Sequence, residues 1–238
     1  MNKLVIYVRH AESYANKIIH DNKKQHEPLN QSQKNLINSL VDPDITEIGI
    51  KQAKCTASHL INNIKKLNRN KITVLVSPFK RTQHTCTYFI ELLDGSEICY
   101  DAKIIEELRE YSPPKMSSST ALTVPEVPRD ILVQESVNRF MDQVLEFNEM
   151  LKKEFESCDT IIIFGHSLFF STLISYHVTH ELYRPTDIPT FQLPNCSISC
   201  EGYNIFNELN NKKTWKTYMV SSISHLGKDI VTGNHVPF

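Results

Sequence analysis

The N-terminal segment carries an apolar run that leads directly into Arg9 and His10; its residues are Leu4, Val5, Ile6, Tyr7 and Val8. An unbroken apolar run rich in β-branched residues is typical of a strand buried on both faces, as in a parallel sheet. In open α/β sheets the ligand site lies just beyond the carboxyl ends of the strands, which is where Arg9 and His10 stand. This pair alone fits a phosphate site and an ordinary strand end at the surface equally well.

Two later apolar runs end in the same kind of residue. The run 72–76 leads to Ser77 and Arg81, and the run 160–164 leads to His166. Because the carboxyl ends of parallel strands meet at one edge of a sheet, we expect these side chains to converge with the first pair. Each also stands near a predicted helix N-terminus, whose free backbone N–H groups attract anions. Arginine binds phosphate oxygens in pairs, so the sequence predicts a phosphate site at this edge.

Segments with helical periodicity lie between the predicted strands, as expected of an α/β protein. Helices are expected over about 11–19, 47–65, 78–93, 134–155 and 168–178, and further extended segments over 98–102, 104–105, 195–200 and 215–221. The interpretation is a single domain over residues 1–238, a three-layer α/β/α sandwich around a mostly parallel, doubly wound sheet. Two polar stretches, about 20–43 and 111–133, are expected to be inserted surface loops, and the tail from Gly227 is expected to be loose.

Composition excludes several classes of function. The 238 residues carry a net charge of −1, which gives no electrostatic reason to expect nucleic acid or an acidic membrane as a partner. No apolar segment has the length of a membrane span or of a signal peptide. The six cysteines include no Cys-x-x-Cys pair, so we expect a cytoplasmic protein with free thiols. The sequence leaves the oligomeric state open.

Five ordered motifs identify a family resemblance that covers roughly residues 4 to 226. They are Arg9-His10-Ala11-Glu12 with Asn16 behind it, Ile45-Thr46-Glu47-Ile48-Gly49-Ile50-Lys51-Gln52-Ala53, Ser77-Pro78-Phe79-Lys80-Arg81-Thr82-Gln83-His84-Thr85, Gly165-His166, and Pro194-Asn195-Cys196-Ser197-Ile198 with Ser224-His225-Leu226. In this set and order the chain resembles the histidine phosphatase superfamily, also called the phosphoglycerate mutase-like family.

The resemblance implies a role for each matched residue. His10 would be the nucleophile that accepts the phosphoryl group, and Arg9, Arg81 and a charged His166 would bind its oxygens. Asn16 and groups near Ser13 and Ser167 are expected to add hydrogen bonds to the substrate. Neutral imidazole is a good nucleophile near pH 7 when an acceptor holds its other ring nitrogen. With two arginines supplying positive charge, neither a metal nor another cofactor is needed.

The reaction also needs a carboxyl group, to protonate the leaving oxygen and then to activate water. The family has this residue in a Leu-x-Glu segment, which Leu108-Arg109-Glu110 matches. Glu110 is therefore the first choice, Glu107 the second and Glu106 the third. A Tyr-Ser-Pro-Pro stretch follows here in place of the family's glycine-containing turn.

The resulting hypothesis is a phosphomonoester hydrolase acting through a phosphohistidine on a phosphorylated small molecule or phosphoprotein. A phosphoglycerate mutase is the first alternative, but Ala11 stands where the mutases usually have glycine, and the two loops do not resemble theirs. An inactive interaction module of the same fold is the second. The intact set of Arg9, His10, Arg81 and His166 argues against it, because a scaffold needs none of them.

Overall fold

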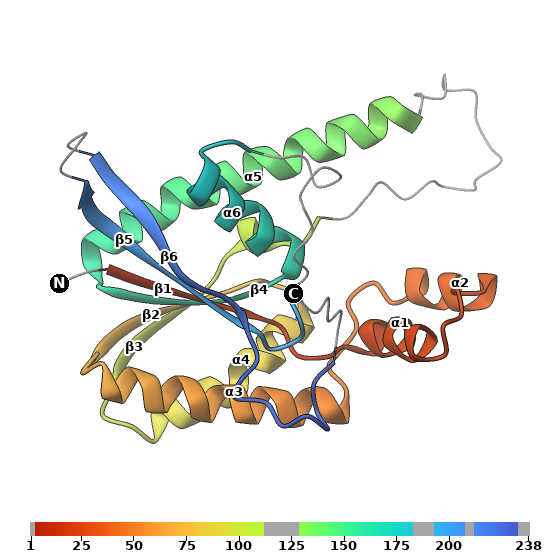
Figure 1. Ribbon diagram of the computed structural model, residues 1–238, viewed down its shortest axis with the longest axis horizontal. Coiled ribbons are helices and arrows are strands. Elements are labelled where there is room, and N and C mark those ends of the chain that lie inside the picture. The colour runs from red at the N-terminus through yellow and green to blue at the C-terminus, as the bar shows by residue number, and fades with distance from the viewer. Residues whose placement is uncertain (1–2, 112–128, 183–192, 208–211, 233–238) are drawn as a thin grey trace.

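The computed structural model describes residues 3–111, 129–182, 193–207 and 212–232. Its centre is a six-stranded sheet in the order β3-β2-β4-β1-β5-β6 (Figure 1). The strands are β1 (Lys3–Arg9), β2 (Lys71–Val76), β3 (Cys99–Ile104), β4 (Thr160–Gly165), β5 (Ile198–Asn207) and β6 (Lys212–Ser222). The first four pair in parallel, β5 runs antiparallel to β1, and β6 runs antiparallel to β5. The prediction of an α/β fold around a mostly parallel sheet is confirmed.

Helices cover both faces of the sheet, which explains why its central strands carry no polar alternation. On one face lie α3 (Glu47–Lys66) and α4 (Lys80–Asp94), and on the other α5 (Arg129–Ser157) and α6 (Ser167–Thr179) (Figure 1). Alternate residues of β1 divide between two apolar cores. Val5 and Tyr7 pack toward α5 and α6, whereas Ile6 and Val8 pack toward α3 and α4.

The start of α3 is packed tightly against the end of the first strand. Thr46 caps the helix, since its Oγ1 accepts the N–H of Gly49 at 3.0 Å. The same hydroxyl donates to the carboxylate of Glu12 at 2.8 Å. A Cβ on Gly49 would lie 2.4 Å from the carbonyl oxygen of Glu12, so the close approach of the two backbones requires glycine here.

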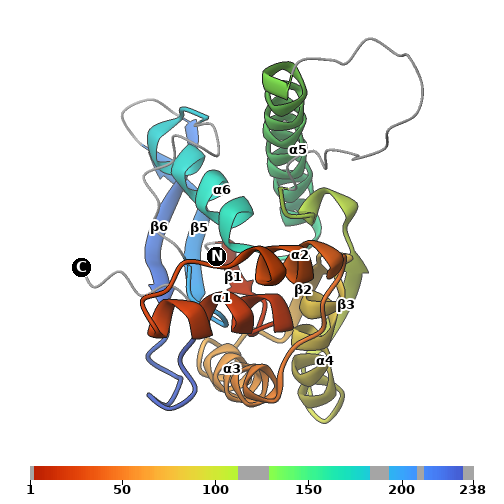
Figure 2. The same cartoon turned by 90° about the vertical axis from the view of Figure 1, so that its right-hand side faces the viewer.

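The prediction for 20–43 was wrong in part, because this stretch is largely helical. The first helix, α1 (Tyr14–Lys24), starts later and ends later than the expected 11–19, and α2 (Gln31–Ser39) follows it. Capping boxes at Ser13 and Asn30 fix where the two helices begin. Both helices lie beyond the carboxyl edge of the sheet, in front of it in the view of Figure 2.

The ends of several other helices and strands differ from those expected from the sequence. Pro78 precedes α4 instead of occupying its first turn, because Phe79 is the N-cap. The expected strand at 195 begins only at Ile198, since Cys196 has a positive φ of 55°. The two extended pieces expected at 98–102 and 104–105 form one strand, β3, followed by a short 3₁₀ helix, η1 (Glu106–Leu108). Of the predicted loop 111–133, residues 112–128 lie outside the described residues, and α5 begins at Arg129.

The expectation of a loose tail from Gly227 was wrong for its first residues. Ile230 and Thr232 are buried, and the side-chain amide of Gln52 donates to the Ile230 carbonyl at 2.7 Å and to Thr232 Oγ1 at 2.6 Å. Residues 233–238 lie outside the described residues. Within the described residues, no helix combines the length and apolarity that crossing a bilayer requires.

Candidate active site

The carboxyl ends of β1, β2 and β4 meet at one edge of the sheet. Arg9 pairs with Gly165 across the β1–β4 ladder, and the N–H of His10 donates to the Gly165 carbonyl at 2.9 Å. The N–H of Ser77 donates to the Phe164 carbonyl at 3.0 Å, which joins the end of β2 to the same point. The predicted convergence therefore occurs, and the rings of His10 and His166 lie with centroids 5.4 Å apart.

The imidazole of His10 is held in one orientation. Its Nδ1–H donates to the carbonyl oxygen of Ala11 at 2.7 Å, so Nε2 carries the free lone pair. The ring is buried, and desolvation lowers its pKa well below the usual 6.5, with further lowering by Arg81 and Arg9. His10 is consequently neutral at pH 7, with an unprotonated nitrogen in a positive field.

The structure corrects the expected charge on His166. Its Nδ1 faces Nη2 of Arg81 at 3.2 Å, and because a guanidinium can only donate, this ring nitrogen is the acceptor. The other nitrogen, Nε2, lies 2.8 Å from Ser77 Oγ and carries the proton. Burial, followed by the charges of Arg81 and Arg9, lowers the pKa of His166 well below 6.5. The ring is neutral, so the positive charge beside it comes from Arg9 and Arg81.

The two arginines are partly buried beside each other. Desolvation lowers the pKa of Arg9 to about 10 and lowers that of Arg81, yet both remain charged at neutral pH. Nη1 of Arg9 donates to the Leu193 carbonyl, whereas its Nε is buried without a hydrogen-bond partner among the described residues. An unpaired buried donor of this kind is one that an anion can satisfy.

Of the three candidate carboxyl groups, Glu110 is the one that interacts electrostatically with Arg9 and Arg81. Its oxygens accept the N–H of Tyr111 at 3.1 Å and that of Leu168, in the first turn of α6, at 3.3 Å. Burial raises its pKa above the usual 4.5, although these two hydrogen bonds and the arginines oppose the rise. By contrast, Glu106 forms an exposed ion pair with Arg109 at 2.7 Å. For Glu107, the described contact is that of its backbone carbonyl with Gln143.

Ser13, Asn16 and Ser167 lie around this edge but already have protein partners. Oδ1 of Asn16 accepts from Asn195 Nδ2 at 3.0 Å and from Ser13 Oγ at 3.2 Å, within the capping box of α1. Oγ of Ser167 accepts the N–H of Leu193 at 3.0 Å. The two serines thus fix backbone segments beside the site, and no hydrogen bond of Asn16 Nδ2 is found among the described residues.

One residue of the site, Asp42, was missed by sequence reasoning. Asp42, in the segment between α2 and α3, accepts the N–H of Lys80 with both oxygens, at 3.0 and 3.1 Å, and pairs with Nη1 of Arg81 at 3.8 Å. It supplies the cap that Phe79 cannot. The Phe79 ring lies edge-on to His166 and under the guanidinium of Arg81, at 4.4 Å. Asp42 is 38 residues from Lys80, so no local pattern reveals it.

Comparisons with known proteins place the chain in a family. The sequence profile of the Histidine phosphatase superfamily (branch 1) matches residues 5–205. A search of curated proteins found no match.

Three solved structures show the fold. One is the α-ribazole phosphatase from Shigella flexneri, with 16% identity and a TM-score of 0.55 over 92% of this chain and 98% of that one. Another is a mutant phosphoserine phosphatase from Entamoeba histolytica in complex with phosphoserine, with 18% identity and a TM-score of 0.53 over 94% of this chain and 98% of that one. The third is a mycobacterial glucosyl-3-phosphoglycerate phosphatase, with 13% identity and a TM-score of 0.56 over 92% of this chain and 99% of that one. At such low identity the likeness establishes the fold and says nothing of the substrate.

Proposed function

The chain belongs to the histidine phosphatase superfamily, and we propose that it is a phosphomonoester hydrolase that forms a phosphohistidine on His10. One observation carries the proposal: His10 is neutral, its Nδ1 is fixed by Ala11, and its Nε2 lies in the field of Arg9 and Arg81. This arrangement matches what attack on a phosphate dianion requires, a free lone pair among fixed positive charges.

In the first step, Nε2 of His10 attacks phosphorus and the bond to the leaving oxygen breaks. Glu110, whose raised pKa favours the protonated form, gives its proton to that oxygen. In the second step, the Glu110 carboxylate takes a proton from water, which attacks phosphorus as the N–P bond breaks. Inorganic phosphate leaves, His10 is neutral again, and Glu110 is protonated for the next cycle.

The groups that bind the phosphoryl oxygens are those with donors directed at this edge. Arg9 offers its unpaired Nε, and Arg81 offers its guanidinium, held between Asp42 and His166. The amide nitrogen of Asn16 adds a neutral donor. Two arginines offset the charge of a dianion, so the proposed reaction requires no metal.

The substrate class is a phosphate monoester of a small molecule or of a protein side chain. The similar structures include a phosphoserine phosphatase and a glucosyl-3-phosphoglycerate phosphatase, which makes both kinds of ester sensible members of a test panel.

A panel of phosphate esters assayed in the presence of a chelator tests the proposal, with 3-phosphoglycerate mutase activity measured alongside. We expect phosphate release from several esters, and a phosphoenzyme that is labile in acid and stable in base. Mutase turnover that exceeds hydrolysis would overturn the choice of hydrolase. No turnover of any ester, together with no phosphoenzyme, would indicate an inactive module.

A further inference from the structure

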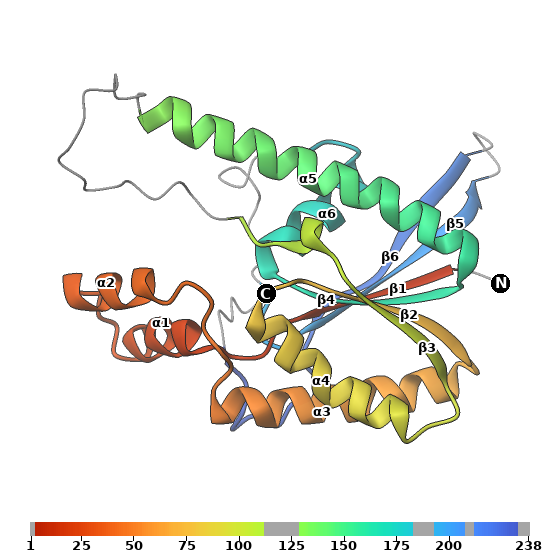
Figure 3. The same ribbon diagram turned by 180° about the vertical axis from the view of Figure 1, so that it is seen from behind.

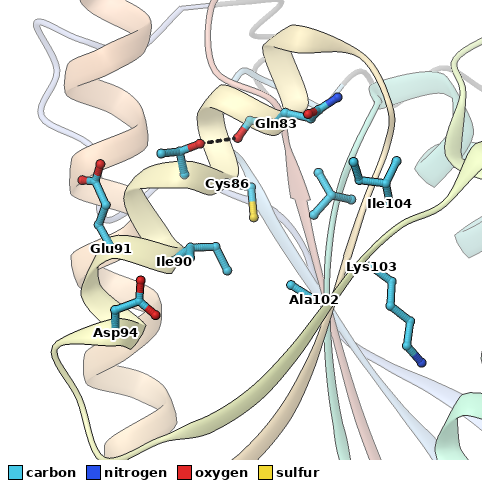
Figure 4. Close-up of a pocket in the computed structure, with 10 residues that line it drawn as sticks. Gln83, Cys86, Ile90, Glu91, Asp94, Ala102, Lys103 and Ile104 are labelled. Atoms are coloured by element: carbon cyan, nitrogen blue, oxygen red, sulfur yellow. Dashed lines mark hydrogen bonds between the residues drawn. The ribbon is translucent and has the colours of Figure 1, made fainter.

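Buried polar atoms without a partner occur beside the candidate active site. Strand β3 and α4 lie side by side (Figure 3) and border a groove of about 390 Å³, lined by residues such as Cys86 and Ala102 (Figure 4). Among the described residues, none that lines this groove has a buried polar atom without a hydrogen-bond partner. Next to His10, by contrast, Nε of Arg9 and Oδ1 of Asn195 are two such atoms. Since unpaired buried polar atoms are rare, Asn195 needs an explanation that the proposed mechanism does not give.

The side chain of Asn195 joins two parts of the site. It is fully buried, and its Nδ2 donates to the carbonyl oxygen of His10 at 3.1 Å and to Oδ1 of Asn16 at 3.0 Å. A side-chain amide nitrogen carries two protons, so each of the two oxygens receives one. The backbone of the proposed nucleophile and a residue expected to bind substrate therefore share one support.

The contacts of Asn195 decide which way its amide faces. A backbone carbonyl can only accept, so the atom that faces the His10 carbonyl must be the nitrogen. Since Oδ1 has no partner among the described residues, the two bonds of Nδ2 alone set this orientation. The residue itself is held in place by its backbone, whose N–H donates to the Thr232 carbonyl at 3.2 Å.

The orientation of Asn16 follows from that of Asn195. Oδ1 of Asn16 accepts from Asn195 at 3.0 Å, from Ser13 Oγ at 3.2 Å and from the Ser13 N–H at 3.4 Å, so the contact with Asn195 is the shortest of the three. With its oxygen held by these donors, the amide nitrogen of Asn16 has no hydrogen bond among the described residues. That nitrogen is thereby kept available for a phosphoryl oxygen.

We propose, on the basis of the function proposed for this site, that Asn195 is a positioning residue that keeps the amide nitrogen of Asn16 directed to the phosphate. Its support of His10 is the lesser effect, because the N–H of Cys196 also donates to the His10 carbonyl, at 3.3 Å. A donor to phosphoryl oxygens binds the ground state and the transition state alike. Loss of Asn195 should therefore raise KM and weaken inhibition by inorganic phosphate more than it lowers kcat.

Asn195→Asp tests this role with little change in size. The new carboxylate would face two oxygens, so Asn16 would turn its amide nitrogen toward it and away from the substrate. We expect KM for an aryl phosphate and the inhibition constant of inorganic phosphate to rise by about tenfold or more, and kcat to fall by less. Asn195→Ala, which removes the donor without adding charge, should shift both constants in the same direction by a smaller factor.

A double-mutant cycle with Asn16→Ala distinguishes loss of orientation from simple repulsion by the added charge. In the Asn16→Ala background there is no amide left to turn, so Asn195→Asp should have a much smaller effect on phosphate inhibition than in the native chain. The matched control is Asn148→Asp, the same change at a buried residue of α5 that contacts His177 at 3.0 Å. It should leave KM and phosphate inhibition unchanged.

Three outcomes would overturn the inference while the proposed function stands: folded Asn195 variants with native KM and phosphate inhibition, a fall in kcat at unchanged KM, or full additivity in the cycle. Thermal melting checks the fold, and Asn195→Ala supplies the same comparison of KM with kcat if Asn195→Asp does not fold. A native chain that neither hydrolyses esters nor binds phosphate would overturn the proposed function and this role of Asn195 together.

Discussion

Nδ1 of His10 and the carbonyl oxygen of Ala11 lie 2.7 Å apart, joined by a hydrogen bond between neighbouring residues. This bond decides which ring nitrogen is protonated and so leaves Nε2 as the nucleophile. The backbone that makes it is itself held from two sides, because the Ala11 N–H donates to Thr85 Oγ1 at 2.9 Å and Asn195 Nδ2 donates to the His10 carbonyl at 3.1 Å.

We expect His10→Ala to lower the turnover rate for an aryl phosphate by about 10³-fold or more, because no other group accepts the phosphoryl group. The melting temperature should change little relative to this loss. Steady-state kinetics and phosphoenzyme labelling measure the effect, and His59→Ala, on α3 outside the site, is the matched control. A folded variant with near-native turnover would falsify the phosphohistidine mechanism.

Replacing Glu110 by Gln removes the proton donor while preserving size and one acceptor oxygen. We expect turnover of alkyl phosphates to fall by about 10² to 10⁴-fold, and that of a nitrophenyl phosphate far less, because nitrophenolate leaves without protonation. Glu107→Gln is the control. If Glu110→Gln costs little for every leaving group while Glu107→Gln discriminates between them, the assignment of the acid passes to Glu107.

The pH dependence of kcat/KM follows from two pKa shifts. The pKa of His10 lies below 6.5, so the nucleophile stays neutral as the pH falls through 6.5. The pKa of Glu110 lies above 4.5, and the rate for poor leaving groups should fall as the pH rises through this raised value. We expect an optimum on the acid side of neutrality. In Glu110→Gln the alkaline decline should disappear; its persistence would assign that decline to another group.

Asp42 should matter both for stability and for Arg81. Asp42→Ala removes the cap of α4, which is expected to cost about 1 kcal/mol of unfolding free energy. The variant should also lower kcat/KM by roughly tenfold, because Arg81 loses one of the groups that hold it. Asp42→Asn keeps an acceptor for the cap and should recover most of the stability but less of the activity. The control is Asp21→Ala, which removes an exposed carboxylate from α1. If Asp42→Ala lowered the unfolding free energy and kcat/KM no more than Asp21→Ala does, this role of Asp42 would be refuted.

Protonation of buried histidines should destabilise the fold in acid. His10, His166 and His177 each have a pKa lowered from 6.5, chiefly by burial. The unfolded chain takes up these protons at a higher pH than the folded protein does, so the unfolding free energy falls as the pH falls below about 6.5, by up to about 1.4 kcal/mol per pH unit for each histidine.

Glu110, with its raised pKa, contributes the opposite slope, since it is stabilising when protonated. Chemical denaturation between pH 6.5 and about pH 5 measures the net effect. In His177→Gln, which removes one of the three buried rings, the slope should be shallower. An unchanged slope would show that His177 is protonated in the folded state as readily as in the unfolded one.

Much of the site could be predicted from the sequence, because short stretches of sequence determine which strands form and which residues follow them. Apolar runs that end in Arg9, Ser77 and His166 define buried parallel strands, and parallel strands bring their carboxyl ends together. The match of Leu108-Arg109-Glu110 to a family segment singled out Glu110, whose charge interacts with Arg9 and Arg81 in the fold.

Tertiary structure decided the charge states, helix caps and burial that depend on residues distant in sequence. The neutral state of His166 follows from Arg81 and Ser77, 85 and 89 residues away, and from burial that no local pattern reports. The cap that Asp42 gives to α4 and the burial of Thr232 against Gln52 likewise arise between segments joined by folding alone. The sequence by itself determined which strands form and which side chains stand at their ends. Only the packed fold set the charges, tautomers and supports of those side chains, because desolvation and hydrogen-bond geometry exist only once the segments meet.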